Sequence, residues 1–374
     1  MRRLANIYRL GIKELWSLWR DPIMLALIAY TFTVAVYTAA KAMPDTLHSA
    51  PIAIVDEDGS ALSTRIASAF YPPLFNPPAM ISTHEMDSGM DAGLYTFVLD
   101  IPPDFQRDVL AGRAATIQLN VDATRMSQAF NGNAYVEQIV LGEINEFIAR
   151  HRADSVPQVD LALRARFNPT LEHTWFGGLM EIINNVTMLS IILTGAALIR
   201  EREHGTVEHL LVMPVTPVEI MLAKVWSMGA VVLLAAATSL LLVVRGLLQV
   251  TIEGSVALFL AGAALHLFAT TSMGIFLATL ARSMPQFGLL LVLVMLPLEL
   301  LSGGTTPRES MPQAVQEIML VAPTTHFVEL GQAILYRGAG MSVVWKPFLA
   351  LLAIGSVLFF LSLKRFRKTI GQMA

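Results

Sequence analysis

The sequence predicts an α-helical polytopic membrane protein with six transmembrane helices and an α/β extracytoplasmic domain between the first and second helices. The chain has 374 residues, of which 54% are hydrophobic and only 15% are charged, whereas soluble proteins are about 45–50% apolar and about 25% charged. The apolar excess lies in runs of the length that crosses a bilayer, about 20 residues. A long polar block separates the first run from the others. These observations exclude an ordinary soluble enzyme and a disordered protein.

Residues 1–22 precede the first apolar run and are expected to form a cytoplasmic amphipathic helix. Within residues 4–19, apolar and aromatic side chains recur at helical spacing, and Arg, Lys and Glu occupy the other side. Asp21 and Pro22 end this pattern. A cleaved signal peptide is the alternative, but the run of residues 23–42 is longer than a signal core of about 7–15 residues. Retention as the first transmembrane helix is therefore favoured.

The polar block of residues 43–173 is predicted to be a small external domain. It contains 8 basic and 17 acidic residues between Met43 and Glu172, whereas the rest of the chain has 18 basic and 12 acidic residues. An acidic block in a basic, apolar chain indicates a domain that faces away from the cytoplasm. The block has no basic face, so nucleic acid is not an expected partner.

Strand and helix patterns alternate within this block, which predicts an α/β domain. The expected strands are Pro51–Val55, Tyr95–Ile101 and Ala115–Val121, and the expected helices are Ala61–Phe70, one with Pro102 and Pro103 in its first turn, and Ser127–His151.

A carboxylate cluster, Asp56, Glu57 and Asp58, follows the first of these strands. We interpret it as a turn, because Asp side chains favour hydrogen bonds to their own local backbone. No histidine lies within the turn to complete a metal site. His326 and Glu329 are two further candidate ligands at helical spacing, and two ligands do not predict a metal site.

Five further apolar runs lie within residues 174–374, where five more transmembrane helices are expected. The penultimate run is short and is followed by glycines, so an external re-entrant segment is expected over residues 303–340. The runs are Trp175–Ile199, Ile220–Val244, Val256–Leu280, Phe287–Ser302 and Val344–Leu363.

Lysine and arginine in the short flanks of the spans predict the orientation of the chain. With the N-terminus inside, 13 basic residues lie in cytoplasmic flanks and five lie in outer flanks. Both termini are therefore expected to be cytoplasmic, with the domain of residues 43–173 outside.

The segment of residues 200–220 combines many charges with residues that break helices. Gly205 interrupts the helix of the second span, Thr206 is suited to cap a short helix over residues 207–212, and Pro214 ends that helix. A short, stiff helix between breakers suits docking into a groove of another protein. We favour docking over an ordinary loop between spans.

The same segment resembles the coupling-helix signature of the ABC-2 type permeases of ABC exporters, also called type V exporters. That signature reads Glu-Arg-Glu, one residue, Gly-Thr, an apolar residue, Glu, one residue, Leu-Leu and a proline-bearing stretch. The resemblance assigns coupling to the ATPase to the matching residues, which are Glu201, Arg202, Glu203, Gly205, Thr206, Glu208, Leu210, Leu211 and Pro214.

Two further matches extend the resemblance over nearly the whole chain. Asp56 with Ser60 and Ser63, the run from Ile101 to Phe105, and Asp122 resemble the multidrug-type inner-membrane transport permeases with a large periplasmic domain. The external re-entrant segment of the family is matched by Ser302, Gly303, Pro307, Glu309, Met311 and Pro312. The sequence departs from the family at Gly304, Thr305 and Thr306, where bulky apolar residues are usual, and at His326, where an aromatic residue is common.

The resemblance implies the permease subunit of an ATP-driven exporter in a bacterial inner membrane, which moves a drug or other amphiphile outward. The chain has no Gly-x4-Gly-Lys-Ser/Thr sequence. It is therefore expected to be no enzyme and to bind no cofactor, with ATP used by a partner. The implied partners are an ABC ATP-binding subunit, a second permease copy or paralogue, membrane lipid, and a periplasmic adaptor with an outer-membrane channel.

Four polar residues lie within the predicted spans, where an ionisable group is costly and indicates function by default. They are Asn184, Asn185, His266 and Glu299. Glu299 lies at a depth comparable with Arg245. An ion pair between these two, or a wet outer vestibule, is favoured over a proton relay.

Two other classes of function are open to a chain of this kind. A secondary transporter driven by an ion gradient would need an ionisable site at midplane and often repeat symmetry, but His266 alone is near midplane and no internal repeat is seen. A membrane-embedded hydrolase is disfavoured because neither Gly-x-Ser-x-Gly nor His-Glu-x-x-His occurs.

Overall fold

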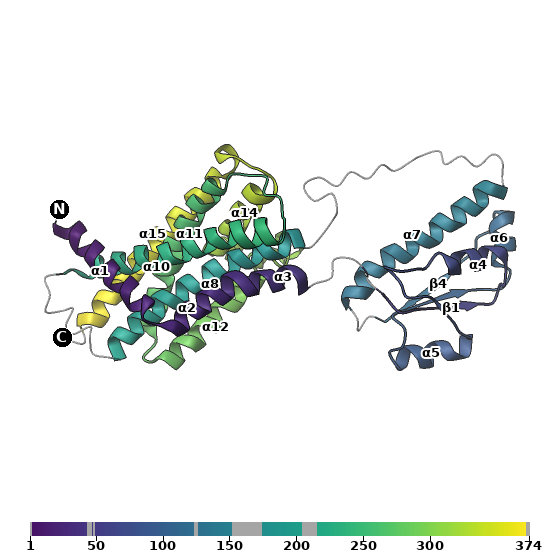
Figure 1. Ribbon diagram of the computed structural model, residues 1–374, viewed down its shortest axis with the longest axis horizontal. Coiled ribbons are helices and arrows are strands. Elements are labelled where there is room, and N and C mark those ends of the chain that lie inside the picture. Colours follow the sequence, from purple (N-terminus) through teal and green to yellow (C-terminus); the bar gives the residue numbers. More distant parts are fainter. Residues whose placement is uncertain are drawn as a thin grey trace. The chain divides into compact units, whose positions relative to one another are not determined.

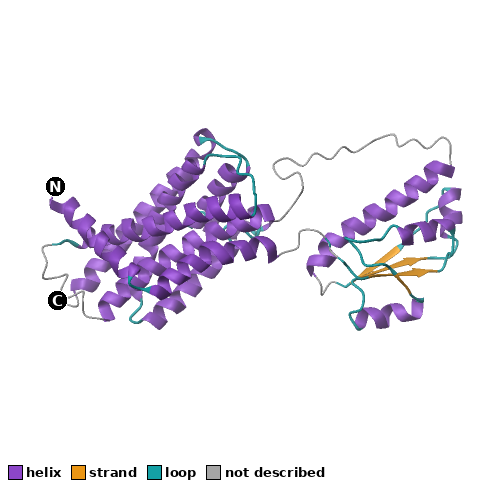
Figure 2. Ribbon diagram, in the orientation of Figure 1, coloured by secondary structure: helices purple, strands orange, loops and turns teal. Residues whose placement is uncertain are grey.

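The computed structural model describes residues 2–42, 47, 49–122, 126–151, 174–203 and 215–371. Contacts divide the chain into two units, Met1–Met43 with His173–Ala374, and Pro44–Glu172. The described part of the first unit is helical, and the second unit contains the β-sheet (Figure 2).

The first span follows an N-terminal helix, α1 (Arg2–Trp19). It comprises α2 (Pro22–Tyr30), a π-helical segment η1 (Thr31–Ala35) and α3 (Val36–Ala42). Asp21 caps α2, because its carboxylate accepts a hydrogen bond of 3.1 Å from the Met24 amide. Pro22 occupies the first turn, where its missing N–H has no cost. The chain therefore changes direction between α1 and the first span.

Four further helices have the length and hydropathy of a membrane span in the described residues. They are α8 (Thr174–Glu203), α10 (Pro217–Ser239) with its π-helical continuation η2 (Leu240–Leu247), α11 (Val256–Leu280) and α15 (Met341–Gly371). Helix α12 (Met284–Leu300) is apolar but shorter, at 17 residues. The predicted fold class is confirmed: this is a helical membrane protein with five or six candidate spans and a small sheet.

The sixth candidate span is a bent pair of helices. Helix α13 (Gln313–Met319) meets the segment Pro323–Tyr336 at an angle of 93°. That segment consists of α14 (Pro323–Gly331) and the π-helical η4 (Gln332–Tyr336), and a 3-10 turn, η3 (Arg308–Ser310), precedes the pair.

Helix α11 lies inside the helical unit and packs against α8, α10 and α15 (Figure 1). Close approach to α8 depends on Gly274, where a Cβ atom would lie 2.3 Å from Thr194 Oγ1 and 2.6 Å from the Ile191 carbonyl oxygen. Small residues at a helix interface allow such approach within membranes.

The second unit contains a four-stranded mixed sheet in the order β2-β1-β3-β4. Strands β1 (Ile52–Asp56) and β3 (Phe97–Ile101) are parallel, as is the short β2 (Ala79–Met80), and β4 (Gln118–Val121) is antiparallel to β3. Strand β2 and the helix after it, α5 (Thr83–Asp91), were not predicted from the sequence.

Helices cover both faces of this sheet (Figure 1). Helices α4 (Ala61–Ser68), α6 (Phe105–Ala111) and α7 (Met126–His151) contribute to the larger core, around Ile54, Phe97 and Leu99. Helix α5 packs on the other face, over Val55 and Val98. The expected proline in the first turn of α6 was wrong: Pro102 and Pro103 precede the helix, and Asp104 adopts a left-handed conformation with φ of 64° at its N-cap.

Candidate functional site

The last turn of α8 carries Glu201, Arg202 and Glu203, and each of these side chains reaches a different helix. Arg202 donates hydrogen bonds to the carbonyls of Ala278 and Ala281 at the end of α11, at 3.0 and 2.9 Å. Glu203 accepts one of 3.1 Å from the Met284 amide at the start of α12. Helix ends leave such backbone groups without partners inside the helix. The two side chains therefore fix the turn between α11 and α12 to α8.

Glu201 belongs to a buried ion cluster, which we define as Glu14, Glu201 and Lys224. The Lys224 ammonium lies 2.8 Å from a Glu201 oxygen and 3.0 Å from a Glu14 oxygen. The Lys224 side chain is only 2% exposed. Lys13 approaches Glu201 from the exposed side, at 3.1 Å. The cluster joins α1, α8 and α10 just before residue 204.

Burial makes this cluster sensitive to the loss of any one charge. Burial raises the pKa of the Glu14 carboxyl above its ordinary value, and nearby Glu201 acts in the same direction, whereas Lys224 opposes both. Two carboxylates thus share one fully buried ammonium. Breaking a buried pair by removing one partner typically costs about 3–5 kcal/mol, because the remaining charge is left without compensation.

Helix α1 also packs directly on Trp226 of α10. The Trp226 indole N–H donates to the Ile7 carbonyl at 3.2 Å, and its ring stacks with Tyr8 at 6.0 Å between ring centroids. A Cβ atom at Gly11 would lie 2.1 Å from the same ring. The absence of a side chain at Gly11 therefore leaves room for the Trp226 ring against α1.

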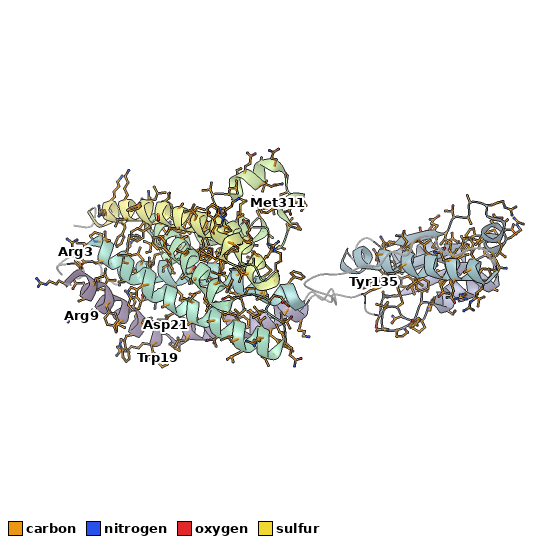
Figure 3. The ribbon with its side chains drawn as sticks, turned by 90° about the horizontal axis from the view of Figure 1, so that it is seen from above. Arg3, Arg9, Trp19, Asp21, Tyr135 and Met311 are labelled. Atoms are coloured by element: carbon orange, nitrogen blue, oxygen red, sulfur yellow. The ribbon has the colours of Figure 1, made fainter. Side chains whose placement is uncertain are left out.

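A second ion pair holds the junction between α1 and the first span. Arg200 lies 2.7 Å from Asp21, the residue that caps α2. Figure 3 places Arg9 and Trp19 along the outer edge of the helical unit. Trp19 is 71% exposed, as expected for an aromatic side chain at a membrane interface.

The remaining predicted coupling residues, Gly205, Thr206, Glu208, Leu210, Leu211 and Pro214, lie outside the described residues. The chain is described again from residue 215. Thr216 then caps α10 in a capping box, with Glu219 accepting hydrogen bonds from the Thr216 amide and hydroxyl at 2.6 and 2.8 Å. This short cap places the start of α10 next to α1, where Asn6 donates to Glu219 at 3.4 Å.

Glu14, Lys224 and Trp226 were not predicted from the sequence as members of this site. Lys224 lies inside an apolar helix, where a charge requires a partner. Glu14 is the one acidic residue of α1. A lysine inside an apolar helix and the single acidic residue of α1 were the sequence features that could have predicted this ion pair.

The predicted re-entrant residues lie together between α12 and α13. Ser302 is buried, and its hydroxyl donates to the Glu299 carbonyl at 3.4 Å. Gly303 has a φ of +94°, a conformation that L side chains rarely adopt. Of the others, Met311 is buried and its carbonyl accepts a hydrogen bond of 2.9 Å from Gln316, whereas Pro307, Glu309 and Pro312 are exposed.

Asn185 and His266 hold helices together within the span region. The Asn185 amide donates to the Thr31 carbonyl at the start of η1, at 2.8 Å. His266 is fully buried, lies 2.8 Å from the Thr187 hydroxyl and stacks on Phe327. Buried polar side chains commonly join helices in this way. Asn184, the residue before Asn185 in α8, is only partly buried.

The expected ion pair between Glu299 and Arg245 was wrong. Both residues are exposed and described, and none of the ion pairs among described residues joins them. Arg245 lies in η2 and Glu299 in the last turn of α12, and Glu299 instead lies near a second carboxylate, Glu181 of α8.

Asp56 organises the turn after β1. One of its carboxylate oxygens accepts from the Asp58 and Gly59 amides at 3.1 and 2.9 Å, and the other accepts from the Ser63 hydroxyl at 2.8 Å. The predicted turn is confirmed.

Known proteins are similar to this chain over its full length. The model of the ABC-2 family transporter proteins matches residues 15–364. The chain is 65% identical to the inner membrane transport permease YhhJ of Escherichia coli K12 over 374 residues, which is all of both chains. It is 28% identical to the probable multidrug ABC transporter permease YbhR of the same organism, over 93% of this chain and 95% of that protein. A further relative, YbhS, bears the same description and is 29% identical over 68% of each chain.

Proposed function

This chain belongs to the ABC-2 family of transporter proteins. We propose that the ATP-binding subunit docks on residues 204–214 and that this segment couples ATP hydrolysis to movement of the spans. The chain is a permease subunit and is not itself catalytic, so an ATP-binding subunit is its partner. The observation that carries the proposal is the last turn of α8. Its three charged side chains join α1, α10, α11 and α12 immediately before residue 204.

The contacts of this turn would transmit a displacement from the docking segment to several helices. If the segment after Glu203 moved, the buried ion cluster, α1 and the α11–α12 turn would move with it. Such a cluster transmits movement because a charged network with little solvent exposure has few alternative arrangements. Helix α1 then carries the displacement to the start of the first span, where Arg200 pairs with Asp21.

We further propose that this inner-membrane, multi-pass permease exports an amphiphile and that both termini are cytoplasmic. The basic residues in the flanks support the orientation, and the relatives described as probable multidrug permeases support the substrate class. A second permease copy would complete the pathway, and a periplasmic adaptor with an outer-membrane channel would continue it through the unit of residues 44–172.

The orientation is testable because the chain has no cysteine. Single-cysteine variants at exposed Ser88 and exposed Arg9 should behave oppositely towards a membrane-impermeant maleimide. In intact spheroplasts, Ser88→Cys should be labelled and Arg9→Cys should react only after the membrane is opened. The reverse pattern would invert the proposed topology, and the unaltered chain, which should stay unlabelled, is the control.

Transport should be tested in inverted membrane vesicles that contain the chain and its ATP-binding subunit. Accumulation of a panel of fluorescent amphiphiles is expected with ATP and not with an imposed proton gradient alone. A Gly205→Pro, Glu208→Lys variant should lose the ATP-driven accumulation. Accumulation driven by the proton gradient in the absence of ATP would contradict the proposal.

A further inference from the structure

A cavity of about 260 Å³ lies beneath α1, between this helix, α8 and α10. Its walls combine charged side chains from α1 and α8 with an apolar floor that includes Leu193 and Met228. The volume is far larger than one water molecule requires and slightly below the range of about 300–1,000 Å³ of drug-sized ligand sites. It therefore suits a small polar group attached to something apolar.

The charged side chains around the cavity are joined by ion pairs. Glu14 and Glu201 lie on either side of the buried Lys224 ammonium. Lys13 and Arg200, which are 52% and 35% exposed, pair with Glu201 and Asp21 nearer the surface. Glu14 itself is only 7% exposed, and desolvation raises the pKa of its carboxyl. A further positive group beside Glu14 would stabilise its ionised form.

The exposed residues of the cavity lining lie on α1. Lys13 and Ser17 are exposed residues of α1 that line the cavity. Next to them, Trp16 and Trp19 are 58% and 71% exposed. Exposed tryptophans on an amphipathic helix lie at the headgroup level of a bilayer. The cavity therefore opens at the depth where lipid headgroups are found.

We propose that this cavity binds the headgroup of a phospholipid whose phosphate ester carries a primary ammonium group. The ammonium would bind at Glu14, and the phosphate would bind between Lys13 and Arg200, where charge-assisted hydrogen bonds are strong. The acyl chains would follow the apolar face of α1 into the bilayer. A wholly anionic headgroup lacks the group that Glu14 binds, and a trimethylated ammonium has no N–H to donate.

The test uses the full chain in nanodiscs of mixed phosphatidylethanolamine, phosphatidylcholine and phosphatidylglycerol, followed by transfer to mild detergent. The lipid that remains bound is then counted by native mass spectrometry. Phosphatidylethanolamine should be retained about tenfold more strongly than either of the others, the factor expected for one charge-assisted hydrogen bond. Equal retention of the three lipids would overturn the proposal.

The matched variants place the same indole at two positions of α1. Ser17→Trp fills the opening and should abolish the retention, whereas Leu4→Trp, at a residue that is 73% exposed and outside the cavity lining, should leave it unchanged. Equal retention by both variants and the unaltered chain would overturn the proposal. Saturation of the cavity by soluble phosphoethanolamine at the same affinity as the lipid would overturn the lipid as its occupant in favour of the free ester.

Discussion

Replacing Lys224 by methionine is expected to lower the free energy of unfolding by about 3–5 kcal/mol, the typical cost of removing one partner from a buried ion pair. Methionine retains most of the volume of the side chain but leaves Glu14 and Glu201 buried without their shared ammonium. Thermal unfolding of the purified protein in mild detergent measures the loss. Lys346→Met, which removes an exposed lysine of α15, should change the unfolding temperature little.

A compensating variant separates the charge effect from a packing effect. Replacing the whole cluster by apolar side chains of similar volume, with Glu14→Leu, Glu201→Leu and Lys224→Met together, removes the uncompensated charges, and such replacements are often neutral or stabilising. Most of the lost stability should therefore return. A triple variant that is no more stable than Lys224→Met would show that the lysine acts through its shape and not through its charge.

Replacing Gly11 by valine is expected to separate α1 from α10. Even a Cβ atom at this position would lie 2.1 Å from the Trp226 ring, and forced overpacking typically costs about 1–3 kcal/mol. Helix α1 should then become accessible to protease in membranes, and ATP-driven transport should fall although the spans remain inserted. Limited proteolysis and transport in the same vesicle preparation measure both effects.

The chain offers a matched control for this variant. A Cβ atom at Gly288 of α12 would meet no heavy atom of the described residues within 4 Å, so Gly288→Val should behave as the unaltered protein. Protease-resistant α1 in the single Gly11→Val variant would contradict the packing described here.

Hydropathy predicts the spans because a segment in lipid must satisfy its backbone hydrogen bonds internally. A long apolar run can therefore adopt few structures other than a helix. The short elements β2 and α5 give weaker signals, since two residues set no period and α5 is mostly polar. The buried ion cluster was missed for a different reason. Glu14 and Lys224 are 210 residues apart in the sequence and meet only through tertiary packing.

The partners of the polar residues in the spans also depend on tertiary packing, which the sequence does not show. Depth along a span suggested that Glu299 pairs with Arg245, but depth does not determine which face of a helix a residue occupies, and both side chains are exposed. Asn185 was found because an amide inside an apolar helix is conspicuous. Its partner, the Thr31 carbonyl, lies where a π-helical segment begins, and the sequence pattern did not predict that segment.

The most direct test of this account is to isolate the tagged chain from its native membranes in mild detergent and identify the proteins that come with it. An ABC ATP-binding subunit should accompany the unaltered chain and should be absent from a Gly205→Pro, Glu208→Lys variant of equal abundance and stability. Recovery of the subunit with both chains would place the docking site elsewhere. Its absence from both, even after chemical crosslinking in the membrane, would contradict coupling to a separate ATPase.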